Sequence, residues 1–210
     1  MPHIKTEIVN EGPRIVSGSK MSYEEFLISP ESEGYAEWVN GDVIKMSPAS
    51  PSHQGIVEFL STLLVLFNEM RARGRVFFAP LQMKLQITGR EPDVPFLAKE
   101  HLDRIRKSHI EGPADIAVEV ISPDSRGRDR GDKYVEYEQA GVREYWLIDP
   151  IRKKAEFYLL GADGTYELAE IGMDGIFRST VLEGFWLKVD WLWQEPLPER
   201  MGVLKEWGLV

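Results

Sequence analysis

The chain has 210 residues, of which 43% are hydrophobic and 28% are charged, and these proportions exclude a chain that is disordered over most of its length. The 25 lysine and arginine residues are outnumbered by 34 aspartate and glutamate residues. The resulting formal net charge of −9 disfavours a protein that coats nucleic acid through bulk positive charge. Cysteine is absent, which excludes disulfides, thiolate zinc sites and a cysteine nucleophile.

The length predicts one domain with short extensions, since a domain takes roughly 150 residues. We expect a tail or edge strand over 1–20, the domain over 21–195 and a C-terminal tail over 196–210. The longest aliphatic and aromatic run, 63–67, is far shorter than the about 20 residues of a membrane span. The charged N-terminus lacks the apolar stretch of a signal peptide. These features predict a cytoplasmic protein with no membrane partner.

Two local patterns predict the first elements. Ser22 and Glu25 have the spacing of a capping box, which predicts a short helix that ends before Pro30. The dipeptide Asn-Gly at 40–41 stands between two apolar runs, which predicts a β-hairpin over 37–46.

A long helix is predicted over 53–73. Its apolar residues recur every three or four positions and define one buried stripe, formed by Ile56, Val57, Leu60, Leu63, Leu64, Phe67 and Met70. Ser52 is expected to cap its first turn, and Gly74 is placed to end it.

Strands dominate the rest of the chain. Alternation of apolar and polar residues over 81–87 predicts a strand with one buried face, and the nearly uniform apolar run 116–121 predicts a central strand. A helix is expected over 129–140, because acidic residues lie in its first turn and a glycine follows it. Further strands are predicted at 76–79, 93–97, 144–148, 154–160, 166–171 and 185–189, and a helix or turn at 99–107. This order of elements predicts an α+β or mixed α/β fold in one domain.

Glu119 is the first residue that points to chemistry, because it lies inside the apolar run 116–121. An ionised carboxylate in a buried strand is unfavourable unless it is paired or binds a metal. The sequence leaves two explanations open, a metal ion and a buried Arg or Lys partner. Asp115 lies on the same strand face but ~13 Å away, at ~3.3 Å per residue, so it cannot share a metal ion with Glu119 directly.

Asp93 is better placed as a neighbour of Glu119. Asp93 opens the strand over 93–97, whereas Glu119 lies near the end of its own strand. If the two strands pair antiparallel, the two carboxylates lie within about 5 Å of each other. Two like charges at this separation repel, and a divalent cation would relieve the repulsion. Carboxylate and water oxygens favour Mg²⁺ or Mn²⁺.

The segments around these residues resemble the restriction-endonuclease-like superfamily with the PD-(D/E)XK motif, and more closely the bacterial Uma-two family of endonucleases. The resemblance extends over roughly residues 21–193. It rests on 35–42, 52–53, 92–93, 118–123, 129–133 and 141–150.

The resemblance implies a restriction-endonuclease-like core, in which helices flank a mixed central sheet, with an N-terminal hairpin and a strand-rich C-terminal extension. It implies a metal-dependent endonuclease that hydrolyses phosphodiester bonds of DNA, in which Asp93 and Glu119 hold Mg²⁺ or Mn²⁺. The superfamily pattern places lysine two residues after the glutamate, where this chain has Ile121. Lys133, from the following helix, is therefore the candidate to assist the attacking water.

Glu37 is the fourth candidate catalytic residue, since it matches by motif the additional acidic residue that superfamily members often carry. Tyr137 lies one turn after Lys133 on the same helix face. The residues expected to support the site are His53, Asp115, Ser122 and Tyr137.

Two other functions fit the sequence. The missing strand lysine and the charge of −9 favour a nuclease-fold module that binds nucleic acid or protein with weak or no catalysis. The second is a structural or homodimeric partner protein, because the tryptophans at 186, 191 and 193 are compatible with a C-terminal dimer surface, and we expect a homodimer. The partner expected for the nuclease is nucleic acid, specifically DNA. Part of the acidity belongs to the predicted site itself, so the negative charge does not exclude a nuclease.

Overall fold

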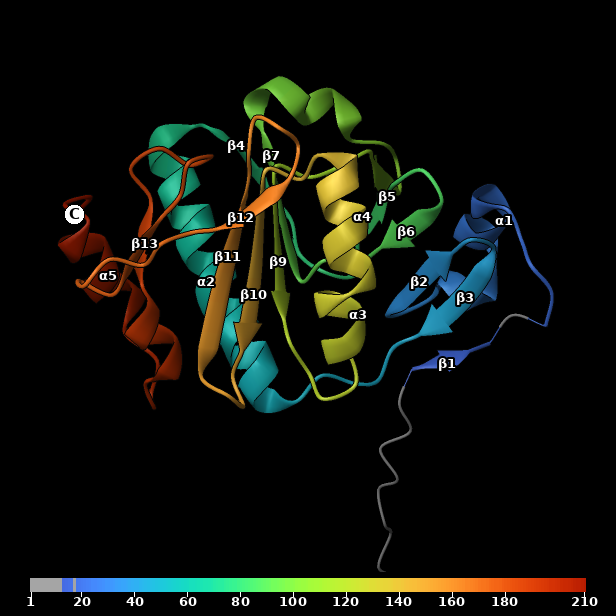
Figure 1. The fold of residues 1–210 in the computed structure, drawn as a ribbon, viewed down its shortest axis with the longest axis horizontal. Helices are drawn as coiled ribbons and strands as arrows, with labels where there is room; N and C mark the ends of the chain where they lie inside the picture. Colours follow the sequence, from blue (N-terminus) through green and yellow to red (C-terminus); the bar gives the residue numbers. More distant parts are fainter. Residues whose placement is uncertain (1–12, 17) are drawn as a thin grey trace, which may run out of the picture.

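The computed structural model describes residues 13–16 and 18–210, and a central six-stranded sheet organises its fold (Figure 1). The strands of this sheet lie in the order β12-β11-β10-β9-β7-β4. β9 and β10 are parallel, and the other neighbours are antiparallel. The strands are β4 (Gly74–Val76), β7 (Val94–Ala98), β9 (Ile116–Val120), β10 (Glu144–Asp149), β11 (Lys154–Leu160) and β12 (Tyr166–Leu168).

A second six-stranded sheet lies beside the first and contains the predicted hairpin, with the strand order β1-β3-β2-β6-β5-β8. Its strands are β1 (Arg14–Ile15), β2 (Ala36–Val39), β3 (Asp42–Lys45), β5 (Gln82–Lys84), β6 (Thr88–Arg90) and β8 (His109–Glu111). β1 is an edge strand within the predicted segment 1–20, and the remainder of that prediction at 1–12 and 17 lies outside the described residues.

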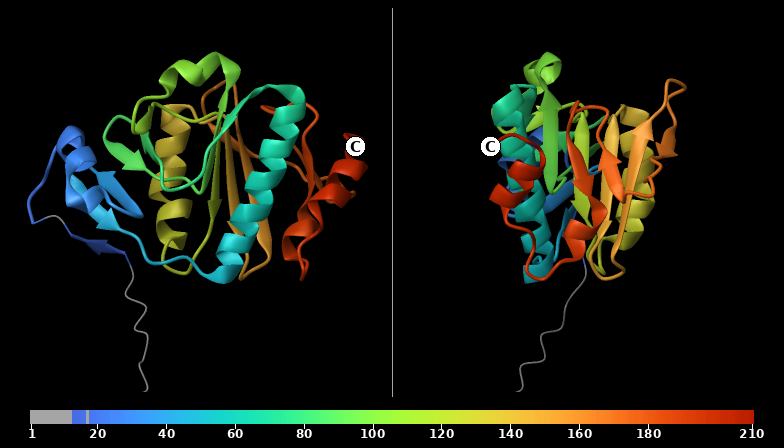
Figure 2. Two further views of the ribbon diagram at one scale, coloured as in Figure 1. Left: turned by 180° about the vertical axis from the view of Figure 1, so that it is seen from behind. Right: turned by 90° about the vertical axis from the view of Figure 1, so that its left-hand side faces the viewer.

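Helices cover both faces of the central sheet, so the expected mixed sheet flanked by helices is confirmed (Figure 2). α2 packs on one face, and α3 and α4 pack on the other. The helices are α1 (Tyr23–Ile28), α2 (Pro51–Arg71), α3 (Arg126–Arg130), α4 (Asp132–Ala140) and α5 (Arg200–Glu206), with 3₁₀ turns at Pro30–Ser32, Lys99–Arg104 and Val189–Trp193.

Successive side chains of β9 point to opposite faces of the central sheet, so they pack against different helices. Ile116, Val118 and Val120 join the core cluster under α2. Ala117 and Ile121 join the cluster under α4. Because side chains of a strand alternate between faces, the carboxylate at position 119 points toward α4.

The long helix α2 starts earlier than predicted. Ser50, and not Ser52, caps it, because the Ser50 hydroxyl accepts a hydrogen bond from the backbone N–H of His53 at 3.2 Å. Pro51 then occupies the first helical position, where its missing N–H removes no intrahelical bond. Ser52, which the sequence predicts as the cap, therefore lies within the first turn of the helix.

The end of α2 also differs from the prediction. The helix stops at Arg71, and Ala72 adopts the left-handed conformation with φ 49°. Gly74 begins β4 instead of ending the helix. Met70 is 57% exposed, so the buried stripe ends at Phe67.

The single strand predicted over 81–87 is wrong. The backbone N–H of Leu85 donates to the carbonyl of Thr88 at 2.7 Å, and the chain reverses there between β5 and β6. As a result Gln82 is buried and Ile87 is 62% exposed, the opposite of the expected faces. A turn inside an alternating segment changes which of its side chains are buried and which are exposed. No glycine or proline lies within 81–87 to indicate such a turn.

The helix predicted over 129–140 is two helices, α3 and α4, divided at Gly131. Gly131 has φ −115° and ψ −91°. A β-carbon at this position would lie 2.8 Å from the carbonyl oxygen of Gly127. The break thus depends on a residue without a side chain.

The C-terminal part extends the core more than predicted. Residues 196–210, for which the sequence predicts a tail, include α5, which packs against α2 and buries Val203 and Leu204. The predicted strand 185–189 is β14 (Trp186–Lys188), and it pairs with β13 (Ile176–Arg178), which the sequence did not indicate. The tryptophans at 186, 191 and 193 pack in or against the core cluster.

No helix in the described part of the chain combines the length and the apolar character needed to cross a membrane.

Gly74→Ala is expected to lower the free energy of unfolding by about 1–3 kcal/mol, because overpacking shifts the surrounding backbone. A β-carbon there would lie 2.0 Å from the carbonyl oxygen of Leu97 and 2.9 Å from Cα of Ala98. The matched control is Gly127→Ala in α3, where nothing lies within 4 Å and about 0.5–1 kcal/mol of stabilisation is expected. Urea unfolding measures both changes, and two shifts of the same sign would contradict this account of the packing.

Candidate active site

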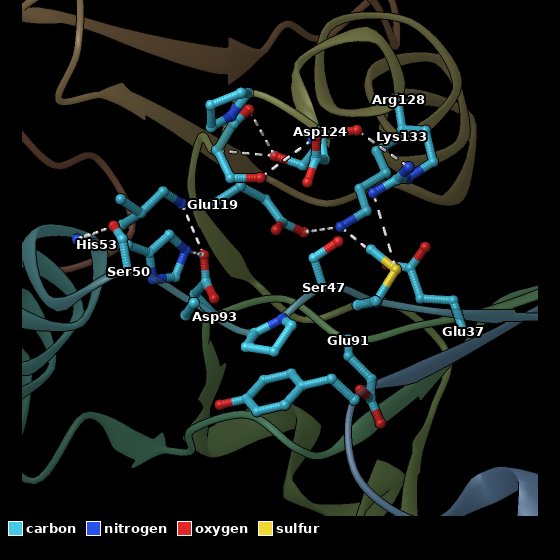
Figure 3. A pocket seen from close by; sticks show the side chains of 18 residues that line it. Glu37, Ser47, Ser50, His53, Glu91, Asp93, Glu119, Asp124, Arg128 and Lys133 are labelled. Atoms are coloured by element: carbon cyan, nitrogen blue, oxygen red, sulfur yellow. Dashed lines mark hydrogen bonds and ion pairs between the residues drawn. The ribbon is translucent and has the colours of Figure 1, made fainter. Parts of the chain in front are cut away.

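A pocket of about 130 Å³ opens where β9 ends (Figure 3). One wall is the loop 46–50, which leads into α2, and another is the loop 122–125, which leads into α3. Six of the eight predicted site residues line it, and two do not, Asp115 and Tyr137. The charged or titratable side chains in its lining are Tyr35, Glu37, His53, Glu91, Asp93, Glu119, Asp124, Arg128 and Lys133.

The register of β7 and β9 brings Asp93 beside Glu119. The two strands are antiparallel with Val94 opposite Val118, so one step further Asp93 lies opposite Glu119. The backbone N–H of Val120 donates to Oδ2 of Asp93 at 2.7 Å. The predicted antiparallel pairing is confirmed, and it leads both carboxylates into the same pocket.

The ammonium of Lys133 lies among three carboxylates. Its Nζ is 2.8 Å from Oε1 of Glu119 and 2.9 Å from Oε1 of Glu37. Oδ1 of Asp129, one turn earlier in the chain, is 3.4 Å away. The Lys133 residue is only 2% exposed. Glu119 therefore has the buried lysine partner that the sequence left open as an alternative to a metal ion.

Arg90 on β6 supplies a second buried cation. Its Nη1 donates to Oε2 of Glu37 at 2.8 Å. Its Nε and Nη2 donate to the two carboxylate oxygens of Glu136 at 2.8 and 2.6 Å. Since Glu37 lies on β2 and Glu136 lies on α4, these ion pairs join the second sheet to the helix that carries Lys133.

The two glutamates held by Lys133 have opposite pKa shifts. Burial raises the pKa of Glu37, but the charges of Lys133 and Arg90 outweigh burial and hold its pKa at about 2. Burial raises the pKa of Glu119 well above its usual range, because Lys133 opposes it only in part and Asp129 and other carboxylates repel the charge. Burial alone would lower the pKa of Lys133, but its carboxylate neighbours raise it well above the usual range. Lys133 is therefore protonated at neutral pH.

Tyr137 holds Glu119 from outside the pocket lining. Its hydroxyl donates to Oε1 of Glu119 at 2.9 Å, and the residue is fully buried. Burial and the neighbouring charge of Glu119 raise the pKa of Tyr137, so the hydroxyl keeps its proton. Tyr137 and Lys133 reach the same carboxylate from one helix face, as their spacing predicts.

His53, in the first turns of α2, faces Asp93. Its Nε2 is 3.3 Å from Oδ2 of Asp93. Burial lowers the pKa of His53, but the hydrogen bond and charge of Asp93 raise it above the usual value. Within the described part of the chain, Nδ1 of His53 is buried without a hydrogen-bond partner.

Asp115 and Ser122 have different surroundings from the rest of the predicted set. Asp115 lies at the opposite end of β9, where Oδ2 accepts from the backbone N–H of Ala98 at 2.7 Å and Oδ1 is 2.8 Å from Nδ1 of His101. The structure does not bring it to the pocket. Ser122 lines the pocket and exchanges hydrogen bonds with Ser125, which shapes the loop before α3.

Sequence reasoning missed several charged residues of the site, among them Arg90, Glu91 and Asp129. Asp129 has the i, i+4 spacing to Lys133 that could have indicated it. Glu91 lines the pocket, and burial raises its pKa to about 7. Arg90 and Glu91 immediately precede the Pro-Asp dipeptide at 92–93, and only the pairing of β6 with β2 reveals their partners.

The donor set fits a divalent cation that is held by few protein ligands. Within the described residues, no three or more His, Asp and Glu side chains gather closely enough to form a metal cage. Mg²⁺ is commonly bound by one or two carboxylates, with water and substrate phosphate completing its shell. The charge balance agrees, because four carboxylates contact two cations, Lys133 and Arg90; they are Glu37, Glu119, Asp129 and Glu136.

Comparison with known proteins identifies the family and agrees with the fold. Residues 23–190 match the model of a family, Uma2, that is described as "Putative restriction endonuclease". The chain belongs to this family. The resemblance stated from the sequence is thereby confirmed.

The structure is also similar to a crystal structure of "a putative nuclease belonging to DUF820" from Anabaena variabilis, with a TM-score of 0.68 and 19% sequence identity. The match covers 82% of this chain and 97% of that chain. At this identity the likeness shows that the two share a fold. The comparison with curated proteins finds no match.

Lys133→Met is expected to lower the free energy of unfolding at neutral pH by about 3–5 kcal/mol, because it leaves buried carboxylates without their cation. The matched control is Lys107→Met, which removes an exposed lysine. Chemical denaturation of both variants measures the difference. Equal stability of the two variants would show that the buried ion cluster is not what holds this region together.

Proposed function

We propose that this protein is a metal-dependent endonuclease that hydrolyses phosphodiester bonds of DNA. The observation that carries the proposal is the pairing of Asp93 with Glu119 across two strands, with the ammonium of Lys133 on Glu119, in one small pocket. Membership of a family described as "Putative restriction endonuclease" supports the same class of reaction.

Asp93 and Glu119 are the residues proposed to hold Mg²⁺ or Mn²⁺. Both offer carboxylate oxygens at the pocket, and the excess of negative charge around them favours a cation. A bound divalent ion supplies Lewis acidity toward a phosphoryl oxygen and lowers the pKa of a coordinated water.

Lys133 acts in this proposal as a fixed positive charge. Its raised pKa keeps the ammonium protonated, so it does not serve as a general base. It holds Glu119 in place and sets a positive charge beside the position where the attacked phosphate gains negative charge. Glu37 contributes by holding Lys133 from β2 of the second sheet.

Two further residues orient the carboxylates. The hydroxyl of Tyr137 donates to Glu119, and the imidazole of His53 contacts Asp93. Each fixes one carboxylate at the pocket before substrate arrives, which reduces the reorganisation that the reaction requires.

A nuclease-fold module that binds nucleic acid with weak or no catalysis is the second candidate. Ile121, two residues after Glu119, is buried in the cluster under α4. Lys133 contacts three carboxylates at once, so a water or phosphate in the pocket must compete with them for its charge. The contact of the Lys133 ammonium with three carboxylates is the observation that favours weak catalysis.

Incubation of plasmid and linear DNA with Mg²⁺ or Mn²⁺ separates the two candidates. We expect cleavage by the wild type, none with EDTA, and a loss of about 100-fold or more in Asp93→Asn and in Glu119→Gln. Asp103→Asn, an exposed aspartate outside the pocket, is the control and should cleave as the wild type does. Cleavage that persists in both pocket variants, or none by the wild type with either metal, would rule out the proposed nuclease site.

A further inference from the structure

Helix α3 carries three arginines, and two of them are neutralised within the protein. Nη2 of Arg126 is 3.3 Å from Oδ2 of the buried Asp149. Arg130 forms an ion pair with Glu156 on β11. These two arginines therefore fasten α3 to the central sheet, and neither lines the pocket.

Arg128, between them, has no carboxylate partner among the residues that the structure describes, and it lines the pocket. Its Nη1 donates to the backbone oxygen of Asp124 at 3.2 Å, and its Nη2 is 3.8 Å from the sulfur of Met46. Its Nε is buried and makes no hydrogen bond to the described residues. Of the five N–H donors of a guanidinium, one on Nη1 and one on Nη2 are thus left for a ligand.

The charge around the pocket makes this arginine distinctive. Glu37, Glu91, Asp93, Glu119 and Asp124 line the pocket and would repel an anionic substrate. Lys133 is already surrounded by carboxylates. Arg128 is therefore a cation of the pocket lining that forms no ion pair with a carboxylate of the described residues. It lies beside Lys133 at the pocket wall (Figure 3).

The size of the pocket limits what the guanidinium can meet. Its volume of about 130 Å³ is below the about 300–1,000 Å³ of sites that enclose a drug-sized ligand. A phosphate group with its bound ion fits this space better than a nucleoside does. A guanidinium matches two phosphate oxygens through two parallel N–H donors.

We propose that Arg128 binds the non-bridging oxygens of the phosphodiester that enters this pocket, and thereby supplies the affinity for nucleic acid that the acidic body of the protein lacks. The inference rests on the proposed nuclease function and adds a substrate-binding residue to it. It also predicts that α3 makes one strong phosphate contact, through Arg128. The other two arginines of α3 only anchor the helix.

The test measures binding of a short fluorescein-labelled DNA duplex by fluorescence anisotropy over a series of salt concentrations. Asp93→Asn serves as the parent, because no turnover is expected in it. Adding Arg128→Gln should raise Kd about tenfold or more and reduce the slope of log K against log salt by about 1. Adding Arg130→Gln removes the same charge two residues away and should change Kd less than about twofold.

Arg128→Lys is the second variant, and it keeps the charge without the planar fork. It should leave the salt slope unchanged and weaken binding by less than the glutamine variant. A merely structural role of Arg128 would lower stability without changing the salt slope.

Equal binding by Arg128→Gln and the parent, or equal losses in Arg128→Gln and Arg130→Gln, would overturn the inference and leave the nuclease proposal standing. If the parent binds no duplex and the wild type cleaves none, the nuclease proposal fails, and the role of Arg128 falls with it.

Discussion

The buried ammonium of Lys133 fixes the relative positions of three parts of the fold. It contacts Glu119 on β9 of the central sheet, Glu37 on β2 of the second sheet and Asp129 on α3. A charge removed from water is tolerated only with close partners, and removal of one partner of such a group is costly. The ion cluster therefore ties the two sheets and the α3–α4 segment together, and it stands where the pocket opens.

The same cluster gives the pocket its chemistry. Burial raises the pKa of Glu119, and the neighbouring carboxylates, which outnumber the cations Arg90 and Lys133, raise it further. This excess of negative charge is destabilising in the protein alone, and the divalent cation that we propose would make it favourable, since a ligand that binds only the folded state stabilises it. Sites that combine local instability with function are common in enzymes. Stability and proposed catalysis thus depend on the same few side chains.

The local patterns of the sequence predicted the part of the site that lies on two strands. Asp93 and Glu119 follow from strand periodicity and antiparallel pairing, which need only a few residues on either side. Lys133 and Glu37 came from the resemblance to a family, because no short-range pattern brings β2 and β9 to the same lysine of α4. Asp115 shows the limit of motif reasoning, since its position one residue before β9 places it at the other end of the strand.

The features that sequence reasoning missed are those that depend on the second sheet and on turns. Arg90 and Glu91 reach the site because β6 pairs with β2, a contact across 50 residues. The reversal between β5 and β6 lies inside a segment that alternates like one strand. The break at Gly131 requires close backbone approach, which composition does not reveal.

The proposed nuclease depends on metal binding between Asp93 and Glu119, and anomalous diffraction from crystals grown with Mn²⁺ tests this most directly. We expect one strong anomalous peak in contact with carboxylate oxygens of both residues, and loss of that peak in Asp93→Asn. A peak bound elsewhere, or no peak in crystals of the wild type at millimolar Mn²⁺, would contradict it.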